Sequence, residues 1–392
     1  MLTKLTKLIA LSTLSLVAVS SLSAKSTIGG IVFVNTYVSD TSIKTQDDPT
    51  QIVNNHDVTK FNVVVPNNSR LRVRWDNEDK VGMYLEVGLG SSSSLSLRHG
   101  YGKWDISEKW QILAGHTSTP FAPLNPQVAM VHNSGDGFGN VNPSRQAQLR
   151  FTYKFLNKQG ALAVAFLDPN AGETYDDGLT SSNDKLQNAS SFPRIDVGAV
   201  YKTFNIQVFP GAFYSRAAFE YGLNDVDVWG ASLGLRTAIG PVTLSMEAAG
   251  GQNWGNTKMS DTKTIHNNTT TVSPYVTTSR TAAVFNGTTD LVDNNILKTW
   301  IDLGYRFAGD TLKGEVHIIG GYDKTDANEA GVDQEYINTM IGVSAPFDMP
   351  WIARGFRLRP ELFYFDESQV DNQRGNATRT ELIAGVQVQF TF

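Results

Sequence analysis

The sequence predicts an all-β fold, a transmembrane antiparallel β-barrel of about 16 strands with short periplasmic turns and long extracellular loops. Three observations predict it. The chain opens on a signal-like apolar segment, most of the remaining chain alternates apolar and polar residues, and the last strand ends on an aromatic residue. Together they are typical of a secreted chain whose strands face lipid on one side and water on the other.

Residues 1–24 have the order of a secretory signal peptide. Lys4 and Lys7 precede an apolar stretch from Leu8 to Val19, and small residues follow up to Ala24. A membrane-anchoring helix is the alternative, but the apolar part is short and rich in Ser and Thr. We therefore expect cleavage after Ala24, with residues 25–392 forming the barrel.

Charge and cysteine content exclude several classes of protein. The 33 basic residues less Lys4 and Lys7 leave 31, against 38 acidic residues, a formal net charge of −7. Nucleic-acid binding requires a concentrated basic surface, so we expect no nucleic-acid partner. The chain has no cysteine, which excludes thiol chemistry and disulfides. We expect no cofactor either, because no pair of histidines has a metal-ligand spacing.

Alternation with period two runs along almost the whole chain after the signal segment. Residues 70–76, 148–155 and 297–307 each place apolar residues on one face and mostly polar residues on the other. About sixteen such segments are expected, beginning near residues 27, 69, 81, 95, 110, 144, 161, 193, 204, 226, 240, 297, 311, 334, 356 and 378. The stretch FNVVVP (residues 61–66) is either part of the second strand or a separate short piece.

The connections alternate in length. Turns such as DISEK and LNKQG are short, whereas residues 120–143, residues 168–191 and the Asn- and Thr-rich run from Asn253 to Asn295 are long. Short turns on one rim and long loops on the other are typical of a bacterial outer-membrane barrel.

The last strand indicates what solvent the apolar face meets. It places six apolar side chains on one face, namely Leu382, Ala384, Val386, Val388, Phe390 and Phe392. In water such a strand would aggregate. A bilayer accepts it if all backbone hydrogen bonds are closed, which requires a barrel. Phe390 and Phe392 are then expected at a membrane interface, where aromatic rings are favoured.

A barrel of this strand number encloses a water-filled channel unless a domain plugs it. The first strand is expected within a few residues of the cleavage site, which leaves no room for a plug. The connection from Pro120 to Pro143 is the candidate for a loop folded into the pore, because it can turn tightly and present polar groups. Its polar candidates are Asn133, Ser134, Asp136 and Asn140. An ordinary surface loop is the alternative.

The alternation assigns more cations than acids to the lumen. The inward cations are Arg70, Arg72, Arg74, Arg98, Arg150, Lys154, Arg194, Lys202, Arg236, Lys298, Arg306, Lys313, Arg357 and Arg359. The inward acids are Asp76, Glu86, Asp196, Glu247, Asp302, Glu315, Glu361 and Glu381. Rings of Arg and Lys favour anions.

Our hypothesis is a pore that prefers small anions such as organic acids. The solute pathway is expected along Arg70, Arg72, Arg74, Arg98, Arg150, Lys154, Arg306, Arg357 and Arg359, with Asp136 on the loop. The alternative is that the arginines pair with nearby acids such as Asp76 and Glu86 and brace the wall.

An enzyme and a surface adhesin or structural protein are the alternatives to a channel. His132, Ser134 and Asp136 are adjacent in sequence, but adjacency is not a catalytic triad and no G-x-S-x-G motif is present. No enzymatic activity is expected. An adhesin or structural surface protein is the stronger alternative, because residues 255–290 form a long polar loop.

Four stretches carry a family resemblance: SRLRVRWDN, LRHGYGKW, LAGHTSTPF and the terminal QFTF. Together they resemble the trimeric general porins of Gram-negative outer membranes, and most closely the DcaP-like porins. The matching positions are Ser69-Arg70, Arg98-His99 and Gly115-His116-Thr117-Ser118. The chain departs from that pattern with His116, where Gln is more usual, and it shows no N-terminal coiled-coil extension.

The resemblance implies passive diffusion of small hydrophilic solutes through a homotrimer embedded in outer-membrane lipid. It also implies that the terminal Phe is recognised by the outer-membrane insertion machinery. We expect the subunit contact on the stretch GGIVFVNTYV (residues 29–38) and on the last strand.

Overall fold

The computed structural model describes residues 25–46, 54–66, 68–90, 95–127, 139–141, 145–169, 174–176, 185–187, 190, 192–218, 225–257, 259, 282–285, 290–309, 312–329, 332–371 and 376–392. The expected signal peptide, the loop residues Asn133, Ser134 and Asp136, and most of residues 255–290 lie outside this part. Within it there is no helix long and apolar enough to cross a membrane.

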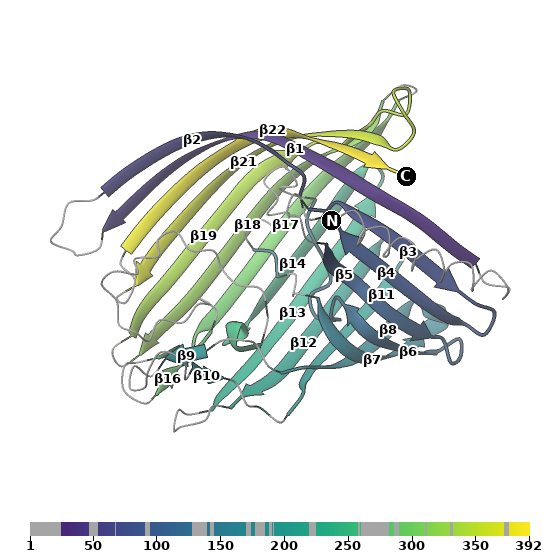
Figure 1. Cartoon of the computed structure of the whole chain (residues 1–392), viewed down its shortest axis with the longest axis horizontal. Helices are drawn as coiled ribbons and strands as arrows, with labels where there is room; N and C mark the ends of the chain where they lie inside the picture. Colours follow the sequence, from purple (N-terminus) through teal and green to yellow (C-terminus); the bar gives the residue numbers. More distant parts are fainter. Residues whose placement is uncertain are drawn as a thin grey trace, which may run out of the picture.

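One antiparallel sheet closes on itself (Figure 1). Its segments are β1 (Lys25–Gln46), β2 (Asn54–Val64), β3 (Arg70–Asp76), β4 (Val81–Gly88), β5 (Ser96–Trp104), β6 (Trp110–Thr117), β7 (Gln146–Phe155), β8 (Gly160–Leu167), β11 (Arg194–Thr203), β12 (Ile206–Ala217), β13 (Val226–Ile239), β14 (Val242–Gln252), β17 (Asn295–Ala308), β18 (Lys313–Glu329), β19 (Val332–Ser344), β20 (Phe347–Asp348), β21 (Phe356–Asp371) and β22 (Asn376–Thr391).

Four short strands and two single-turn helices lie outside the main sheet. They are β9 (Thr174–Asp176), β10 (Lys185–Gln187), β15 (Val284–Phe285), β16 (Leu291–Val292), η1 (Leu156–Lys158) and η2 (Trp254–Thr257). β9 pairs with β10 and β15 pairs with β16.

The described segments make sixteen spanning strands, as the sequence predicts. β2 and β3 are two parts of one strand, because both pair with β1 along the same edge. β20 likewise continues β19, because both lie between β18 and β21. The ring closes where β22 pairs with β1 from Ile31–Thr391 to Gln46–Asn376, the yellow and purple strands side by side in Figure 1.

The predicted strand starts each fall within two residues of a segment start, with one difference. The second spanning strand begins at Asn54 rather than near residue 69, so the stretch 61–66 belongs to it. The strand breaks at Pro66, which cannot donate a backbone hydrogen bond. The Ser69 hydroxyl repairs the ladder there, because its Oγ accepts from Phe33 N at 3.0 Å.

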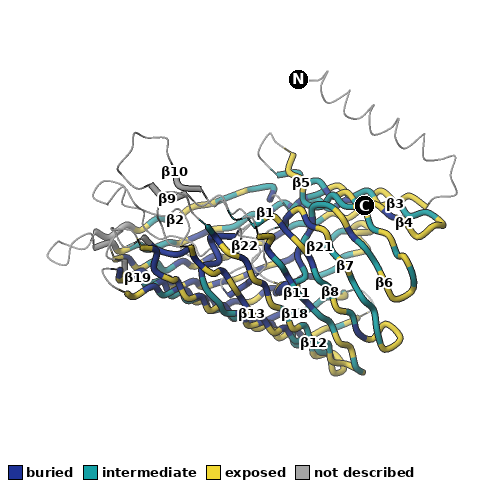
Figure 2. Tube along the Cα trace, turned by 90° about the horizontal axis from the view of Figure 1, so that it is seen from below, coloured by how far each residue is buried: buried dark blue, intermediate teal, exposed yellow. Residues whose placement is uncertain are grey.

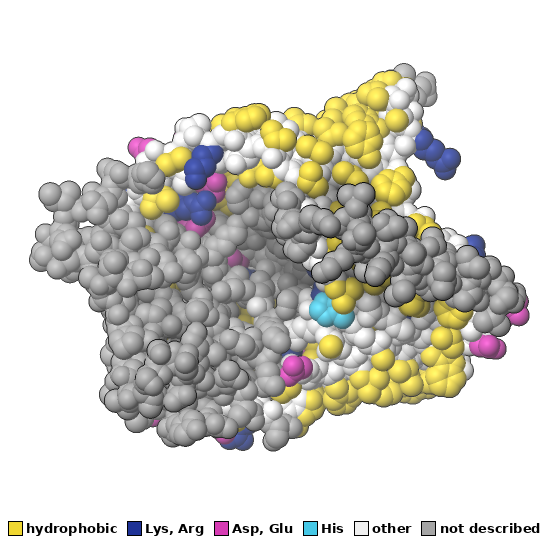
Figure 3. All heavy atoms as spheres, viewed as in Figure 1, with side chains coloured by type: hydrophobic (Ala, Val, Ile, Leu, Met, Phe, Trp, Pro, Cys, Tyr) yellow, Lys and Arg dark blue, Asp and Glu magenta, His cyan; other side chains and the backbone are white. Residues whose placement is uncertain are grey.

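The two faces of the wall differ as the alternation predicts. On β17, Leu297, Ile301 and Tyr305 are exposed whereas Lys298 and Asp302 are buried. Buried and exposed residues alternate along the strands in Figure 2, and hydrophobic side chains cover much of the outer wall in Figure 3. Exposed apolar surface of this extent indicates contact with lipid.

The rim opposite the short turns is less uniform than expected. Only residues 330–331 separate β18 from β19, and residues 372–375 separate β21 from β22. The longest connections leave β6, β8 and β14, as the sequence indicates.

The carboxyl end is hydrogen-bonded to β1 at the seam where the barrel closes. Phe392 N donates to Gly30 O at 3.1 Å, and Gly30 N donates to Phe392 O at 2.8 Å. The Phe392 ring lies over Gly30, where a β-carbon would stand 2.5 Å from its Cζ atom. Phe390 contacts Phe356, with the ring centroids 5.2 Å apart. Both C-terminal aromatics therefore lie on the rim of the short turns.

We expect Phe392→Ala to slow assembly and to lower the unfolding temperature of the barrel. The ring covers the seam but is 67% exposed, so the loss of packing is about 1 kcal/mol. Heat-modifiability on gels measures the stability, and the folded fraction in outer membranes measures assembly. Phe61→Ala, an equally exposed ring on β2, is the control. Equal behaviour of the two variants would contradict a special role for the terminal residue.

Candidate pore lining and constriction

Arg70, Arg72 and Arg74 lie on one face of β3, alternating with Leu71 and its apolar neighbours on the other. The register places Arg72 opposite Glu86 of β4. Because Leu71 is exposed on the outer wall, the three guanidinium groups lie on the side of the lumen. The sequence therefore assigns these side chains to the face on which the structure has them.

A β-bulge brings two consecutive residues of β5 to the lumen. Glu86 pairs with His99 and Val87 pairs with Leu97, which leaves Arg98 as the extra residue. A bulge re-aims side chains in this way. Arg98 then reaches Glu86, while His99 Nδ1 lies 2.8 Å from Thr117 Oγ1.

Glu86 stands at the centre of an arginine cluster, defined here as Arg70, Arg72, Arg98 and Glu86. Its carboxylate oxygens are 2.8 Å from Arg72 Nε, 2.8 Å from Arg98 Nε and 3.4 Å from Arg70 Nε. The Tyr84 hydroxyl also donates to it at 2.8 Å. One carboxylate thus contacts three guanidinium groups. Its single negative charge offsets one of their three positive charges, so the cluster has a net charge of about +2.

His99 extends this cluster toward the long-loop rim. Arg145 Nε donates to His99 Nε2 at 3.1 Å, so Nε2 is the accepting nitrogen and Nδ1 carries the proton toward Thr117. Arg150 Nη1 donates to Ser118 O at 3.4 Å. Sequence reasoning missed Arg145, because the alternation of the strand predicted from about residue 144 puts it on the face opposite Arg150. In the structure Arg145 precedes β7, so the alternation does not fix its direction.

Near the short-turn rim the lumen cations are paired with acids. Arg74 Nε and Lys103 Nζ lie 2.6 and 3.0 Å from the Asp76 carboxylate. Lys154 Nζ lies 3.0 Å from Asp105 Oδ1. These pairs are half-exposed, so each contributes little stability.

The other predicted pathway cations lie on β17 and β21. β17 is about halfway around the ring from β3–β5, whereas only β22 and β1 separate β21 from β3. Arg306 Nε bonds Glu315 Oε1 at 2.9 Å, and Arg357 holds Asp348 through two bonds of 2.7 and 3.0 Å. Arg359 is buried, with 5% of its surface exposed. Of these three arginines, Arg306 and Arg357 line cavities, whereas Arg359 has little access to solvent.

The start of the connection after β6 lies against the inside of β11 and β12. Phe121 is fully buried and packs edge-on against Phe213, with the ring centroids 4.9 Å apart. Phe121 also meets Trp254 at 6.1 Å. Pro120 lies so close to β11 that a β-carbon on Gly198 would stand 2.1 Å from its carbonyl oxygen. The start of the connection therefore has an apolar core of its own inside the barrel.

Three wall carboxylates accept backbone N–H groups of this connection. Leu124 N donates to Glu247 Oε1 at 3.3 Å, and Gln127 N donates to Asp302 Oδ2 at 2.8 Å. Gly139 N donates to Asp323 Oδ1. The acids come from β14, β17 and β18, about halfway around the ring from β3–β5 by strand order. The connection thus crosses the barrel from one wall to the other.

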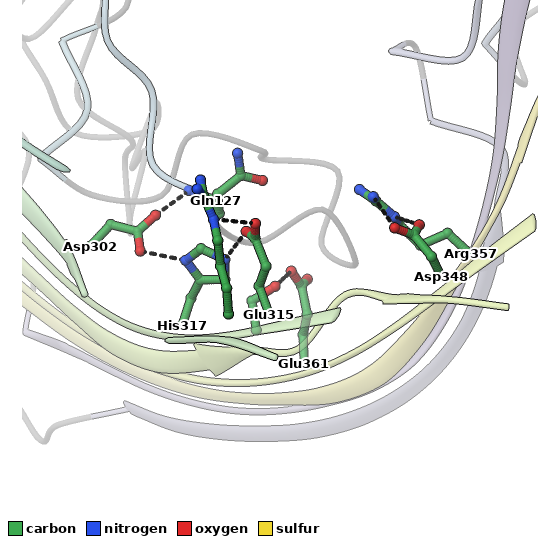
Figure 4. Close-up of polar contacts among 9 residues, drawn as sticks. Gln127, Asp302, Glu315, His317, Asp348, Arg357 and Glu361 are labelled. Atoms are coloured by element: carbon green, nitrogen blue, oxygen red, sulfur yellow. Dashed lines mark hydrogen bonds and ion pairs between the residues drawn. The ribbon is translucent and has the colours of Figure 1, made fainter. Parts of the chain in front are cut away.

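Two adjoining cavities lie between the connection and the wall. One, of about 380 Å³, is lined by residues that include Asn125, Gln127, Arg236, Asp302 and His317. The other, of about 470 Å³, shares Gln127, Arg306 and Glu315 with it. Figure 4 shows Asp302, Glu315 and His317 projecting from the strands into the interior, with Gln127 beside Asp302.

Buried ion pairs hold other lumen-side cations away from solvent. Arg194 bonds both Asp196 oxygens at 2.7 and 2.8 Å, and its guanidinium lies 4.6 Å from the Phe213 ring. Lys298 Nζ lies 3.7 Å from Asp323 Oδ2. In the described residues no group of three or more His, Asp or Glu side chains is placed to hold a metal ion.

No protein-family model matches the sequence, and no curated protein matches it. Among solved structures, the fold is similar to the outer membrane channel DcaP of Acinetobacter baumannii, with 16% identity, a TM-score of 0.62, and 94% of this chain and 97% of that chain covered. It is also similar to an anion-selective porin from Comamonas acidovorans, with 13% identity, a TM-score of 0.54, and 94% and 100% covered. The fold is therefore that of the porins of the Gram-negative outer membrane.

We expect Phe121→Ala to loosen the connection from the wall. The change empties a fully buried site, which costs roughly 3–5 kcal/mol, yet no strand pairing is touched. Protease cleavage between residues 128 and 138 should become faster while the barrel stays heat-modifiable. Phe166→Ala, on the outer face of β8, is the control. Unchanged cleavage would show that the Phe121 contacts do not hold the connection.

Proposed function

We propose that this protein is an outer-membrane channel for passive diffusion of small hydrophilic solutes, with a preference for anions such as organic acids. The observation that carries the proposal is the arginine cluster on the lumen side of a sixteen-strand barrel. Its two excess positive charges lower the barrier for an anion and raise it for a cation. One of the similar structures is itself described as anion-selective.

The distribution of acids supports the same preference. On the wall opposite the arginine cluster, Glu247, Asp302 and Asp323 accept backbone N–H groups of the connection after β6. All three acids are buried, so a solute cannot contact them directly, whereas the cluster residue Arg72 keeps 36% of its side chain exposed. The two hypotheses from the sequence, an anion pathway and a structural brace, are therefore compatible. The arginines pair with Glu86, and the cluster still keeps excess positive charge.

We further propose that residues 120–143 constrict the lumen. Support comes from the packing of Phe121 inside the barrel and from the three backbone anchors at Leu124, Gln127 and Gly139. A segment held at points on the far wall narrows the passage between itself and the arginine cluster. Asp136 remains a candidate for the narrowest point.

The assembly that fits this surface is a homotrimer. The outward faces of β1 and β22 carry small or β-branched residues in register, with Val34 opposite Val388 and Thr36 opposite Val386. Such a face is smooth, and so it suits close packing of one barrel on another better than a face of large aromatics.

An adhesin or structural surface protein is the second candidate. It would use the loops of the long-loop rim and would need no wide, charged interior. The arginine cluster and the two lumen cavities favour the channel.

Replacing Arg72 and Arg98 with Ser should abolish most of the anion preference. Two unit charges about 8 Å from the path contribute roughly 0.5 kcal/mol each in water, so the anion-to-cation permeability ratio should fall several-fold. Reversal potentials in planar bilayers under a salt gradient measure it. Arg216→Ser is the control, because that arginine pairs with Asp225 at an exposed position. An unchanged ratio would contradict the arginine pathway, and wild-type protein without conductance would favour the adhesin.

Val34→Arg with Val388→Arg should convert the trimer to monomers. A lipid-facing arginine costs about 2–4 kcal/mol at the midplane, and here it would also stand inside the subunit contact. Native gels in mild detergent measure the assembly. Leu233→Arg, exposed on the outer face of β13, is the matched control and should keep the trimer. Trimers in both variants would place the contact elsewhere.

A further inference from the structure

Asp302 joins the connection after β6 to a histidine of the wall. Its Oδ2 accepts the backbone N–H of Gln127 at 2.8 Å, and its Oδ1 lies 2.7 Å from His317 Nδ1. Asp302 comes from β17 and His317 from β18, whereas Gln127 belongs to the connection. Figure 4 shows the three residues in contact. The orientation of the Asp302 carboxylate therefore depends on both Gln127 and His317.

His317 lies between two carboxylates. Its Nε2 is 2.9 Å from Glu315 Oε2, and Glu315 Oε1 accepts from Arg306 Nε at 2.9 Å. The ring lies over Gly304, where a β-carbon would stand 2.8 Å from its Cε1 atom. The glycine therefore leaves the space that the ring occupies between Asp302 and Glu315.

The geometry requires more protons than a neutral imidazole carries. Both ring nitrogens face carboxylate oxygens, and a neutral ring has one N–H. Both contacts are hydrogen bonds when the ring is doubly protonated. After loss of that proton, one nitrogen and one carboxylate oxygen face each other as two acceptors, and one contact must open.

Charged groups lie near the ring on its own strand, on β17, and on the more distant strands β13 and β21, whereas the residue opposite it on β19 is the uncharged Ser344. Asp302 and Arg306 face it from β17 and Glu315 from β18, and Arg236 of β13 lines the same cavity. From β21, Glu361 accepts from Ser344 Oγ at 2.7 Å, and Arg359 is buried beside it. Asp302 and Glu315 make the direct contacts to the ring, so they set its response to pH.

We propose that His317 is a positioning residue of the channel: through Asp302 it holds the connection at Gln127, and loss of the ring proton weakens that anchor. The proposal rests on the proposed channel function and names a regulation of its constriction by pH. At acidic pH the charged ring keeps Asp302 turned toward Gln127. At alkaline pH the carboxylate reorients more freely, and the constriction fluctuates.

Single-channel recordings of the whole protein test this from about pH 5 to about pH 9, the range in which histidine titrates. Wild type should show several-fold more current fluctuation at the alkaline end. His317→Asn keeps an N–H donor near Nδ1 but cannot titrate, so its fluctuation should not vary with pH. Asp225→Asn removes a carboxylate that pairs with the exposed Arg216 and contacts neither the ring nor the connection, so it should keep the wild-type pH dependence. A His317→Asn profile equal to wild type overturns the proposal.

A second measurement needs no conductance. The chain has no cysteine, so Asn125→Cys introduces a single thiol into the cavity beside Gln127. Labelling rates with a water-soluble thiol reagent are compared with and without His317→Asn at each pH, which cancels the titration of the thiol. A rate ratio that changes with pH supports the coupling, and a constant ratio overturns it. If the Asn125→Cys protein shows the expected pH-dependent rate ratio but the wild type conducts no current, the proposed function fails and the coupling stands.

Discussion

The closed backbone ladder is the constraint on which the rest of the structure depends. In lipid an unpaired N–H or C=O group has no water to bond, so the wall must have no edge. β22 meets β1 over sixteen register pairs, and Phe392 is bonded to Gly30 at the end of the seam. Where the ladder is interrupted at Pro66, the Ser69 hydroxyl supplies the missing partner for β1. Side chains are free to vary only because this requirement is met.

Lipid also explains why the sequence predicts the wall so well. Most outward positions that meet lipid are apolar, and inward positions meet water or protein, so a period of two runs along most of β17 and β22. Strand starts follow from the alternation. The early part of the second strand does not, because residues 54–60 contain a single apolar residue, Val58, and so show no alternation.

Contacts inside the lumen depend on register, which one sequence does not reveal. Glu86 and Arg72 are 14 residues apart and directly opposed, whereas Arg98 reaches Glu86 through a bulge. Alternation predicts that Arg98 and His99 lie on opposite faces, yet the bulge brings both inward. The same uncertainty separates Arg306 and Arg357, which line cavities, from Arg359, which the wall buries. Residue type indicates the face, and register decides the partner.

The connection after β6 shows how far inward acids are structural. Counting charges treats Glu247 and Asp302 as anions of the lumen, and the alternation does not single out Asp323 at all. The structure uses them to accept backbone N–H groups that no strand satisfies, at points 123, 175 and 184 residues away in sequence. A buried N–H group left without a partner is costly, so a segment that crosses a barrel needs acceptors on the far wall. Carboxylates used in this way are less available to attract cations. The same acids therefore hold the connection after β6 and leave the excess charge to the arginine cluster.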